Sequence, residues 1–311
     1  MAVAIPTLHT YHTDDSRPVQ LDFYPPTEYK PETEKYKTLI FFHGGGLVFG
    51  NRKTYPPDGV MSRIASKGWI FISADYHLLP ESSLDHIRQD VAALQEWILK
   101  NSNGLRIDTE RVSVAGASAG SFVALLLLDQ WKTIKPRSFV NMFGMVDTAG
   151  KQYTEPRTTA KTVGWNTPTS EFRANVATYK KYLTPPFGPR VWDDHSPLDN
   201  LNNRSGLMGW LFLEGKVPNL INGYDVDAVW DSNTAFTPLK LISSAFPPAI
   251  TVHGDQDSTV PIDDAYALAK AYERAGIFHQ LEVVEGAEHG LMPPVDRSEY
   301  WEKVVSFLEE H

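Results

Sequence analysis

Short apolar runs alternate with helix-periodic segments along most of this chain. The runs are rich in β-branched and aromatic residues, and the central ones are continuously apolar, which is typical of strands buried on both faces of a sheet. They predict strands at residues Thr7–Thr13, Val19–Tyr24, Thr38–Phe42, Ile70–Ala74, Val112–Ala115, Phe139–Phe143, Ala249–Val252 and Gln280–Val284. Strands that alternate with helices indicate an α/β fold, with a parallel sheet and crossover helices.

Helical periodicity marks the segments between several of these strands. It covers residues 87–98, 262–275 and 299–308. The first helix should end before Asn103 and Gly104 and the second at Gly276, because these residues favour helix ends. A run of leucines, Leu125–Leu128, lies in a further helix expected after Ser118. We interpret this run as core under the sheet rather than as a ligand contact.

The alternation stops between about Asp147 and Ala245. This stretch is rich in Pro, Gly, Asn and Trp and has no strand-like run, and residues 179–182 and 207–213 predict short helical pieces. A long loop without structure of its own is uncommon in a compact domain. We therefore predict a mostly helical cap at residues 147–245, inserted into a core made of residues 1–146 and 246–311.

Composition excludes several classes of function. The net charge of −9 comes without a basic stripe, so no nucleic-acid partner is expected, and the absence of cysteine excludes disulfides and thiolate chemistry. The first residues lack the pattern of a secretory signal. The apolar stretch from Ser121 to Leu128 is far shorter than the roughly 20 residues that span a bilayer. We expect no membrane span and a cytoplasmic location.

The segment Gly116-Ala117-Ser118-Ala119-Gly120 carries the first chemical signal. It follows a predicted strand and precedes a predicted helix, which is the context of a nucleophile elbow. In such an elbow the serine hydroxyl projects above the sheet, near a helix N-terminus that favours developing negative charge. We predict Ser118 as a catalytic nucleophile, although a turn of small residues would have the same sequence.

Three glycines follow His43 at the end of another predicted strand. Gly44, Gly45 and Gly46 allow bare backbone N–H groups to point into a site, where they can stabilise the oxyanion of a tetrahedral intermediate. A phosphate cradle is the alternative, but no Gly-Lys-Ser/Thr or dinucleotide fingerprint accompanies the glycines. We therefore predict an oxyanion hole.

A serine nucleophile needs a base and a carboxylate, which in this type of fold follow it in the order acid, then histidine. His289 comes after the last predicted strand and is the predicted base. Asp257 lies deep in the loop after the preceding strand and is the predicted acid. Asp255 and Glu288 are the alternatives, which we interpret as a turn-capping residue and as a side chain directed away from His289.

These motifs, together with Asp75-Tyr76-His77-Leu78-Leu79-Pro80-Glu81, resemble the hormone-sensitive-lipase-like branch of the α/β-hydrolases, which includes carboxylesterases, arylacetamide deacetylases and kynurenine formamidases. The resemblance covers about residues 19–145 and 246–308. It implies an eight-stranded sheet, a helical cap, no metal or other cofactor, and a small-molecule acyl substrate, and it allows a homodimer. It also implies that Gly45, Gly46 and Ala119 donate to the oxyanion and that His43 holds the glycine loop.

Three positions depart from the family pattern. The residue before the nucleophile is Ala117 where an acidic residue is usual, Ser121 replaces a third glycine, and His77 stands where arginine is usual. None of these departures removes a predicted catalytic group, but together they indicate a divergent member.

The resulting hypothesis is a serine hydrolase that cleaves a carboxylic ester of a small hydrophobic or aryl substrate through an acyl-enzyme. Leu47, Val48 and Phe49 adjoin the glycine loop and are candidate substrate contacts. Cap aromatics could line the pocket or form the cap's own core; they are Trp165, Phe172, Trp192, Trp210, Phe212 and Trp230. The alternatives are a specialised lactonase, thioesterase, formamidase or C–C bond hydrolase of a biosynthetic pathway, and a non-catalytic ligand-binding protein.

Overall fold

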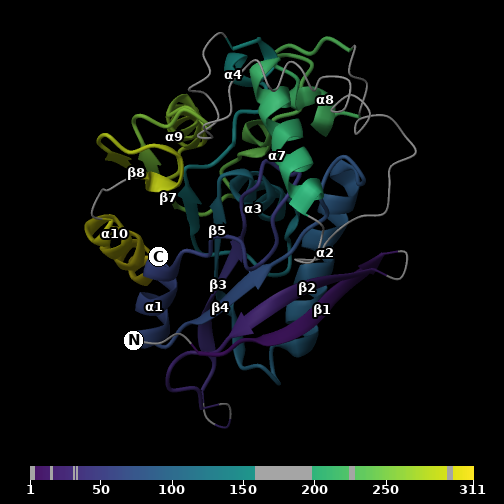
Figure 1. The fold of residues 1–311 in the computed structure, drawn as a ribbon. Helices are drawn as coiled ribbons and strands as arrows, with labels where there is room; N and C mark the ends of the chain where they lie inside the picture. The colour runs from purple at the N-terminus through teal and green to yellow at the C-terminus, as the bar shows by residue number, and fades with distance from the viewer. Residues whose placement is uncertain are drawn as a thin grey trace.

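A computed structural model describes residues 4–14, 17–30, 32, 34–157, 198–223, 228–292 and 297–311, with only the backbone for residues 198–203 and 205. A single sheet runs through the molecule (Figure 1). Its eight strands are β1 (Thr7–Asp14), β2 (Arg17–Tyr24), β3 (Tyr36–Phe42), β4 (Ile70–Ala74), β5 (Ile107–Ala117), β6 (Phe139–Met142), β7 (Ala249–Gly254) and β8 (His279–Val284).

The strand order is β1-β2-β4-β3-β5-β6-β7-β8. The strand β2 pairs antiparallel with β1 and β4, and all other neighbours pair parallel. The eight-stranded, mostly parallel sheet predicted from the sequence is thus confirmed. Parallel pairing brings the carboxyl ends of β3, β5, β7 and β8 to one edge of the sheet, where open α/β folds place their ligands.

Two layers of helices cover the sheet. The helices α1 (Asp58–Ser66) and α10 (Ser298–Glu310) pack side by side on one face (Figure 1). The other face carries α2 (Leu84–Asn101), α3 (Ala119–Gln130) and α9 (Asp263–Ala275), which share a hydrophobic cluster. Neighbouring residues of β3 alternate between the layers, since Ile40 and Phe42 join this cluster while Leu39 and Phe41 join that of α1 and α10.

The helix predictions agree with the structure at most positions. The leucine run Leu125–Leu128 is buried in α3, as predicted, and α9 ends at Gly276 in the left-handed conformation. The helix α1 was not predicted, because only four of its residues are buried and two prolines precede it. Its short apolar face gives a weak periodic signal.

Part of the predicted cap is described. It contains α4 (Lys151–Thr154), α7 (Leu198–Leu213), α8 (Val217–Ile221) and the 3₁₀ turn η2 (Pro238–Leu241). The helices α4, α7 and α8 lie together at one end of the molecule (Figure 1). The helix predicted at 207–213 is the second half of α7. The piece predicted at 179–182 lies outside the described residues, and the boundaries of the cap stay a prediction.

Candidate active site

Ser118 occupies the sharp turn between β5 and α3. Its backbone has φ 54° and ψ −124°, which is a strained conformation for a residue with a side chain. Neighbouring backbone lies against both glycines of the turn. A Cβ on Gly116 would lie 2.4 Å from Gly120 C, and a Cβ on Gly120 would lie 2.0 Å from Phe42 O, so neither position can hold a side chain. The two glycines therefore permit the turn that exposes the Ser118 hydroxyl.

The three predicted side chains form one hydrogen-bonded chain. His289 Nε2 lies 3.0 Å from Ser118 Oγ, and His289 Nδ1 lies 2.7 Å from Asp257 Oδ2. Since a carboxylate only accepts, Nδ1 carries the proton and Nε2 accepts the hydroxyl proton of Ser118. The side chain of His289 is 21% exposed whereas that of Asp257 is buried, so the base can meet a substrate and the acid cannot.

Asp257 is held as a carboxylate. Its Oδ1 accepts the N–H groups of Thr259 at 3.0 Å and Val260 at 2.9 Å, while Oδ2 faces two histidines. Burial alone would raise the pKa of Asp257, but His289 and His253 outweigh burial and bring this pKa down to about 2. The group stays ionised over the working pH of any ordinary esterase.

The two alternative carboxylates bind elsewhere. Asp255 Oδ1 accepts the N–H of Gly286 at 2.7 Å, in the turn after β8. Glu288 Oε2 accepts from the N–H of Ser258 at 3.0 Å and from its hydroxyl at 2.8 Å. Both side chains tie the loop after β7 to the loop after β8, which fixes the distance between the acid and the base.

The glycine loop lies beside Ser118. A Cβ on Gly44 would lie 3.7 Å from Ser118 Oγ, and Gly45 and Gly46 have φ values of 117° and 61°. Within the described part of the chain, the N–H groups of Gly45, Gly46 and Ala119 donate no backbone hydrogen bond. They are therefore free to donate to an oxyanion.

His43 holds the glycine loop through contacts of its ring and its backbone. Its Nδ1 donates to Gly44 O at 2.7 Å, and its ring stacks on Tyr76 at 4.4 Å. Burial lowers the pKa of His43 to about 4, with its bond to the Gly44 carbonyl opposing, so the ring is neutral at neutral pH. The Tyr76 hydroxyl donates to His43 O at 2.8 Å. These contacts agree with the structural role that the resemblance implies for His43.

The candidate substrate contacts are mostly covered. Leu47 and Val48 are fully buried, Trp210 and Phe212 are 3% and 2% exposed, and Phe49 is half-buried. Trp230 is also half-buried, while Trp165, Phe172 and Trp192 lie outside the described residues. The part of these residues in substrate binding stays a prediction.

Two further residues at the site were not predicted. The Phe143 ring meets that of His289 edge to face, with centroids 5.1 Å apart. His253 is fully buried, donates from Nε2 to Val260 O at 2.8 Å, and places the same nitrogen 3.3 Å from Asp257 Oδ2. Phe143 directly follows β6 and His253 lies near the end of β7, so both are at the edge of the sheet that carries Ser118. Strand-end position was the sequence signal that could have indicated them.

Two of the three departures from the family pattern have hydrogen-bond partners in the structure, and the third is a buried alanine. Ser121 Oγ donates to Gly116 O at 2.9 Å and closes the elbow, and Ala117 is buried. His77 lies 2.7 Å from Asp90 and 3.2 Å from Asp14, so it binds carboxylates on α2 and β1. The backbone N–H of Ser121 also donates to Ser118 O at 3.0 Å, so this residue helps to hold the turn that carries the predicted nucleophile.

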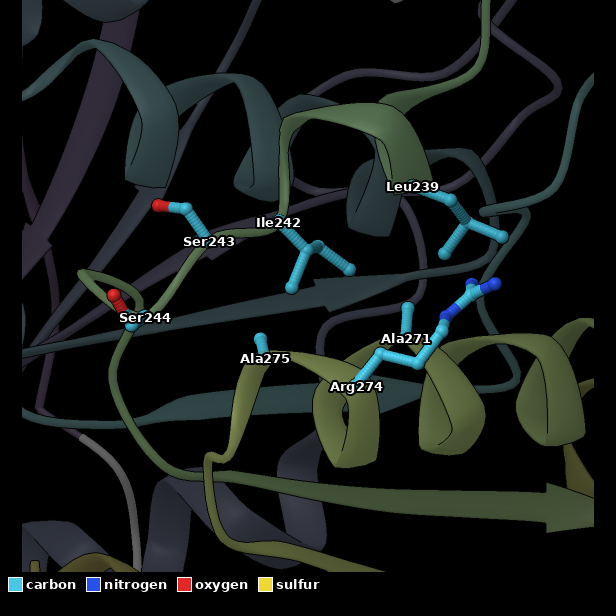
Figure 2. Close-up of a pocket in the computed structure, with 7 residues that line it drawn as sticks. All are labelled: Leu239, Ile242, Ser243, Ser244, Ala271, Arg274 and Ala275. Atoms are coloured by element: carbon cyan, nitrogen blue, oxygen red, sulfur yellow. The ribbon is translucent and has the colours of Figure 1, made fainter.

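A pocket of about 450 Å³ lies elsewhere, between η2 and α9. Figure 2 shows Leu239 and Ile242 facing Ala271, Arg274 and Ala275 across it. No residue predicted for the site lines this pocket.

Within the described residues, no cluster of three or more histidine or acidic side chains is arranged to hold a metal ion. None of the described helices is both long and apolar enough to cross a membrane.

The sheet, the elbow and the strand-end loops define the α/β-hydrolase class of proteins. Residues 39–237, well over half of the chain, match the family described as alpha/beta hydrolase fold, and the chain belongs to this family. This match confirms the resemblance seen in the motifs. Residues 212–311, which contain Asp257 and His289, are also similar to the prolyl oligopeptidase family.

Individual proteins show how far this similarity extends. The chain is 24% identical to Lipase 2 of a Moraxella species over 82% of the chain and 54% of that protein. It is 25% identical to the non-reducing polyketide synthase Preu3 of Preussia isomera over 86% of the chain but 12% of the synthase. The chain thus spans about half the length of the lipase and a small part of the synthase.

A solved structure has the same fold. The butyrate-bound esterase Est2 of Thermogutta terrifontis superimposes with a TM-score of 0.64 at 20% identity, over 98% of this chain and 94% of that one.

Proposed function

We propose that this protein is a serine hydrolase that cleaves carboxylic esters of small acyl compounds. The observation that carries the proposal is the hydrogen-bonded chain from Ser118 Oγ through His289 to Asp257, with contacts of 3.0 Å and 2.7 Å. A hydroxyl, an imidazole and a carboxylate in this order activate a serine for attack on an acyl carbon. The similarity to a lipase, and to an esterase bound to butyrate, supports an ester with a short or medium acyl chain.

The reaction proceeds in two halves. Ser118 Oγ attacks the carbonyl carbon while His289 Nε2 takes the hydroxyl proton, and Asp257 stabilises the imidazolium. The N–H groups of Gly45, Gly46 and Ala119 hold the oxyanion of the tetrahedral intermediate. His289 then gives its proton to the leaving alcohol. Water then attacks the acyl carbon while His289 Nε2 takes one of its protons. His289 returns this proton to Ser118 Oγ as the carboxylic acid leaves, which regenerates the serine hydroxyl.

The Ser118→Ala variant tests this proposal. We expect turnover of p-nitrophenyl acetate and butyrate to fall by at least about 10³-fold, since the nucleophile is lost. A fluorophosphonate probe should label the parent chain at the peptide that contains Ser118, as read by mass spectrometry, and should leave the variant unlabelled. The matched control Ser66→Ala changes an exposed serine of α1 and should keep full activity. Unchanged turnover, or labelling at another residue, would overturn the proposal.

A second candidate is the hydrolysis of an acyl thioester or lactone in a biosynthetic pathway. It is favoured by the similarity to a polyketide synthase, which extends over 86% of this chain. The same catalytic chain would serve, because thioesters and lactones pass through the same tetrahedral intermediate. Rates on matched oxygen esters, thioesters and aromatic lactones distinguish the candidates. Negligible rates on every simple ester, with turnover of a thioester or lactone abolished by Ser118→Ala, would favour this second function.

A further inference from the structure

The helix α7 touches the glycine loop at two points, and the first is Arg204. Its Nη1 donates to Val48 O at 2.8 Å and to Leu79 O at 3.5 Å, and its Nη2 pairs with the carboxylate of Glu81. The side chains of Arg204 and Glu81 are only 12% and 10% exposed. Arg204 thus joins α7 to two segments that are far from it in the sequence.

The carbonyl of Val48 belongs to the same turn as Gly45 and Gly46, the predicted oxyanion donors. The N–H groups of Val48 and Phe49 both donate to Gly45 O, at 3.0 Å and 3.1 Å, and Leu79 N donates to Leu47 O at 2.8 Å. Residues 45–49 and 79–81 therefore form one hydrogen-bonded unit. The guanidinium of Arg204, on α7, binds both segments of this unit, through Val48 O in the first and through Leu79 O and Glu81 in the second.

The second contact comes one turn further along α7, at Met208. A Cβ on Gly46 would lie 2.2 Å from Met208 Sδ and 2.6 Å from its Cγ, so the thioether packs directly on the Gly46 backbone. Residues four apart lie on the same face of a helix. The face of α7 that carries Arg204 and Met208 therefore covers the glycine loop, in which Gly44 lies beside Ser118.

The loop needs such support because its own conformation is costly. Gly45, Gly46 and Leu47 all have positive φ, with Leu47 at 65°, which is unfavourable for a residue with a side chain. Oxyanion donors contribute most when they are held in place before the reaction. A planar guanidinium with several donors can fix more than one acceptor at once, which a lysine ammonium on a flexible stem does poorly.

We propose that Arg204 is a positioning residue for the oxyanion hole, holding the Gly45 and Gly46 amides in their productive geometry from α7. This inference rests on the proposed hydrolase function. It assigns Arg204 no contact with the substrate, and it leaves the proton transfer from Ser118 to His289 unaffected.

The test compares Arg204→Lys and Arg204→Met with the parent chain. The lysine variant keeps a positive charge beside Glu81, so it retains the fold even if the methionine variant does not. We expect Arg204→Lys to lower kcat on p-nitrophenyl butyrate by about 10- to 100-fold, with KM changed by less than about threefold, since the donors act mainly on the transition state. Affinity for a trifluoromethyl ketone should fall in proportion to kcat/KM. The pH at half-maximal kcat/KM should not move, because the base and acid are untouched.

The control is Arg88→Met, which changes a part-exposed arginine paired with Asp85 on α2 and should leave all three readouts unchanged. An unchanged kcat and ketone affinity in Arg204→Lys would overturn the inference, as would a loss confined to KM. The two proposals fail separately. If Ser118→Ala keeps its activity, the hydrolase proposal is wrong; if Ser118→Ala is inactive and Arg204→Lys is fully active, only the role of Arg204 is wrong.

Discussion

At the scale of single residues, the predicted catalytic side chains could be found in the sequence because each comes shortly after a predicted strand. Ser118, Asp257 and His289 each follow a strand of a parallel sheet, and such loops converge at one edge. Two nearby carboxylates compete with Asp257 for the role of acid, because loop sequence does not define where a side chain points. The structure separates them by their partners, since Asp255 and Glu288 hold the two loops together and Asp257 faces His289.

Arg204 marks the limit of residue-level prediction. It pairs with Glu81, which is 123 positions away, and it comes from a stretch without strand rhythm. No periodicity or motif connects the two residues, because their contact depends on how α7 is placed over the loop. Contacts of this kind follow from tertiary packing rather than from local pattern.

The Asp257→Asn variant tests the choice of acid. An amide in this place favours the wrong tautomer of His289 and cannot stabilise the imidazolium, so we expect kcat on p-nitrophenyl butyrate to fall by about 10³–10⁴-fold. The controls Asp255→Asn and Glu288→Gln weaken one and two hydrogen bonds between the loops, respectively, and each should cost less than about tenfold. Should either control lose more activity than Asp257→Asn, the acid has been assigned wrongly.

At the scale of elements, buried strands were predicted well and their polar ends were not. The strand β5 begins at Ile107 rather than at Val112, because residues 107–111 are mostly polar and give no apolar run. The first of them pairs with Tyr36 before an irregularity in the ladder. Backbone pairing therefore extends the strand beyond the part that hydrophobic burial makes visible in the sequence.

Arg52 lies just after the glycine loop and links β2 to the segment that follows β4. Its side chain lies 2.9 Å from Asp22 of β2 and 2.8 Å from Asp75 after β4, and both carboxylates are 4% exposed. Its backbone N–H also donates to Asp75 at 2.6 Å. Burial raises the pKa of Asp75 to about 6, although Arg52 opposes the rise. The arginine is thus the counter-charge of two buried carboxylates.

We predict that Arg52→Met lowers the free energy of unfolding by about 3–5 kcal/mol at pH 8, because it leaves both carboxylates buried without their cation. The loss should be smaller at pH 5.5, where protonation of Asp75 removes part of the uncompensated charge. Urea unfolding at the two pH values measures the difference. Arg63→Met, which removes a part-exposed pair with Glu302, should cost about 1 kcal/mol or less at both pH values. An equal loss for Arg52→Met at the two pH values would contradict the electrostatic account.

The junction between β6 and the predicted cap contains a pair of acidic residues. Asp264, in the first turn of α9, accepts the N–H groups of Val146 at 2.7 Å and Asp147 at 2.8 Å, and it also binds Gln152 and Tyr153. Burial and the neighbouring Asp264 raise the pKa of Asp147 to about 6, with Lys240 opposing. The Asp147 carboxylate is therefore costly to ionise in the folded state.

This raised pKa predicts how stability depends on pH. The folded chain holds the Asp147 proton more tightly than the unfolded chain, so this residue's contribution is complete below about pH 4 and is lost as the pH rises to about 6. Asp147→Asn should raise the free energy of unfolding at pH 7.5 by about 1 kcal/mol, a value reduced because solvent partly screens the group. At pH 4.5 the gain should be much smaller. Urea unfolding that showed the larger gain at pH 4.5 would refute this prediction.

At the scale of the whole molecule, the described helices of the predicted cap share the core of the sheet. Leu207, Leu211 and Phe212 of α7 and Leu220 of α8 belong to the same hydrophobic cluster as β3, α2 and α3. The sequence indicated an insertion but not this continuity, because burial of a helix depends on what it packs against. One shared cluster implies that the two parts stabilise each other.

We therefore predict that the chain unfolds in one cooperative transition in which the described cap helices take part. Phe212 is 2% exposed, meets the ring of Tyr153 at 5.4 Å and lies under the guanidinium of Arg157 at 5.3 Å. Phe212→Ala should lower the free energy of unfolding by about 3–5 kcal/mol. Tryptophan fluorescence and far-ultraviolet circular dichroism should shift to the same lower midpoint.

The matched control is Phe278→Ala. It removes a phenylalanine that is 56% exposed beside Phe307 and should cost about 1 kcal/mol or less. If Phe212→Ala instead splits unfolding into two transitions and lowers only the first, the cap unfolds independently and the shared cluster does not couple it to the sheet. A single shifted midpoint would mean that α7, with Arg204 and Met208 on it, is as firmly placed over the glycine loop as the sheet itself. Such rigidity is what a helix needs in order to hold an oxyanion hole in its productive geometry.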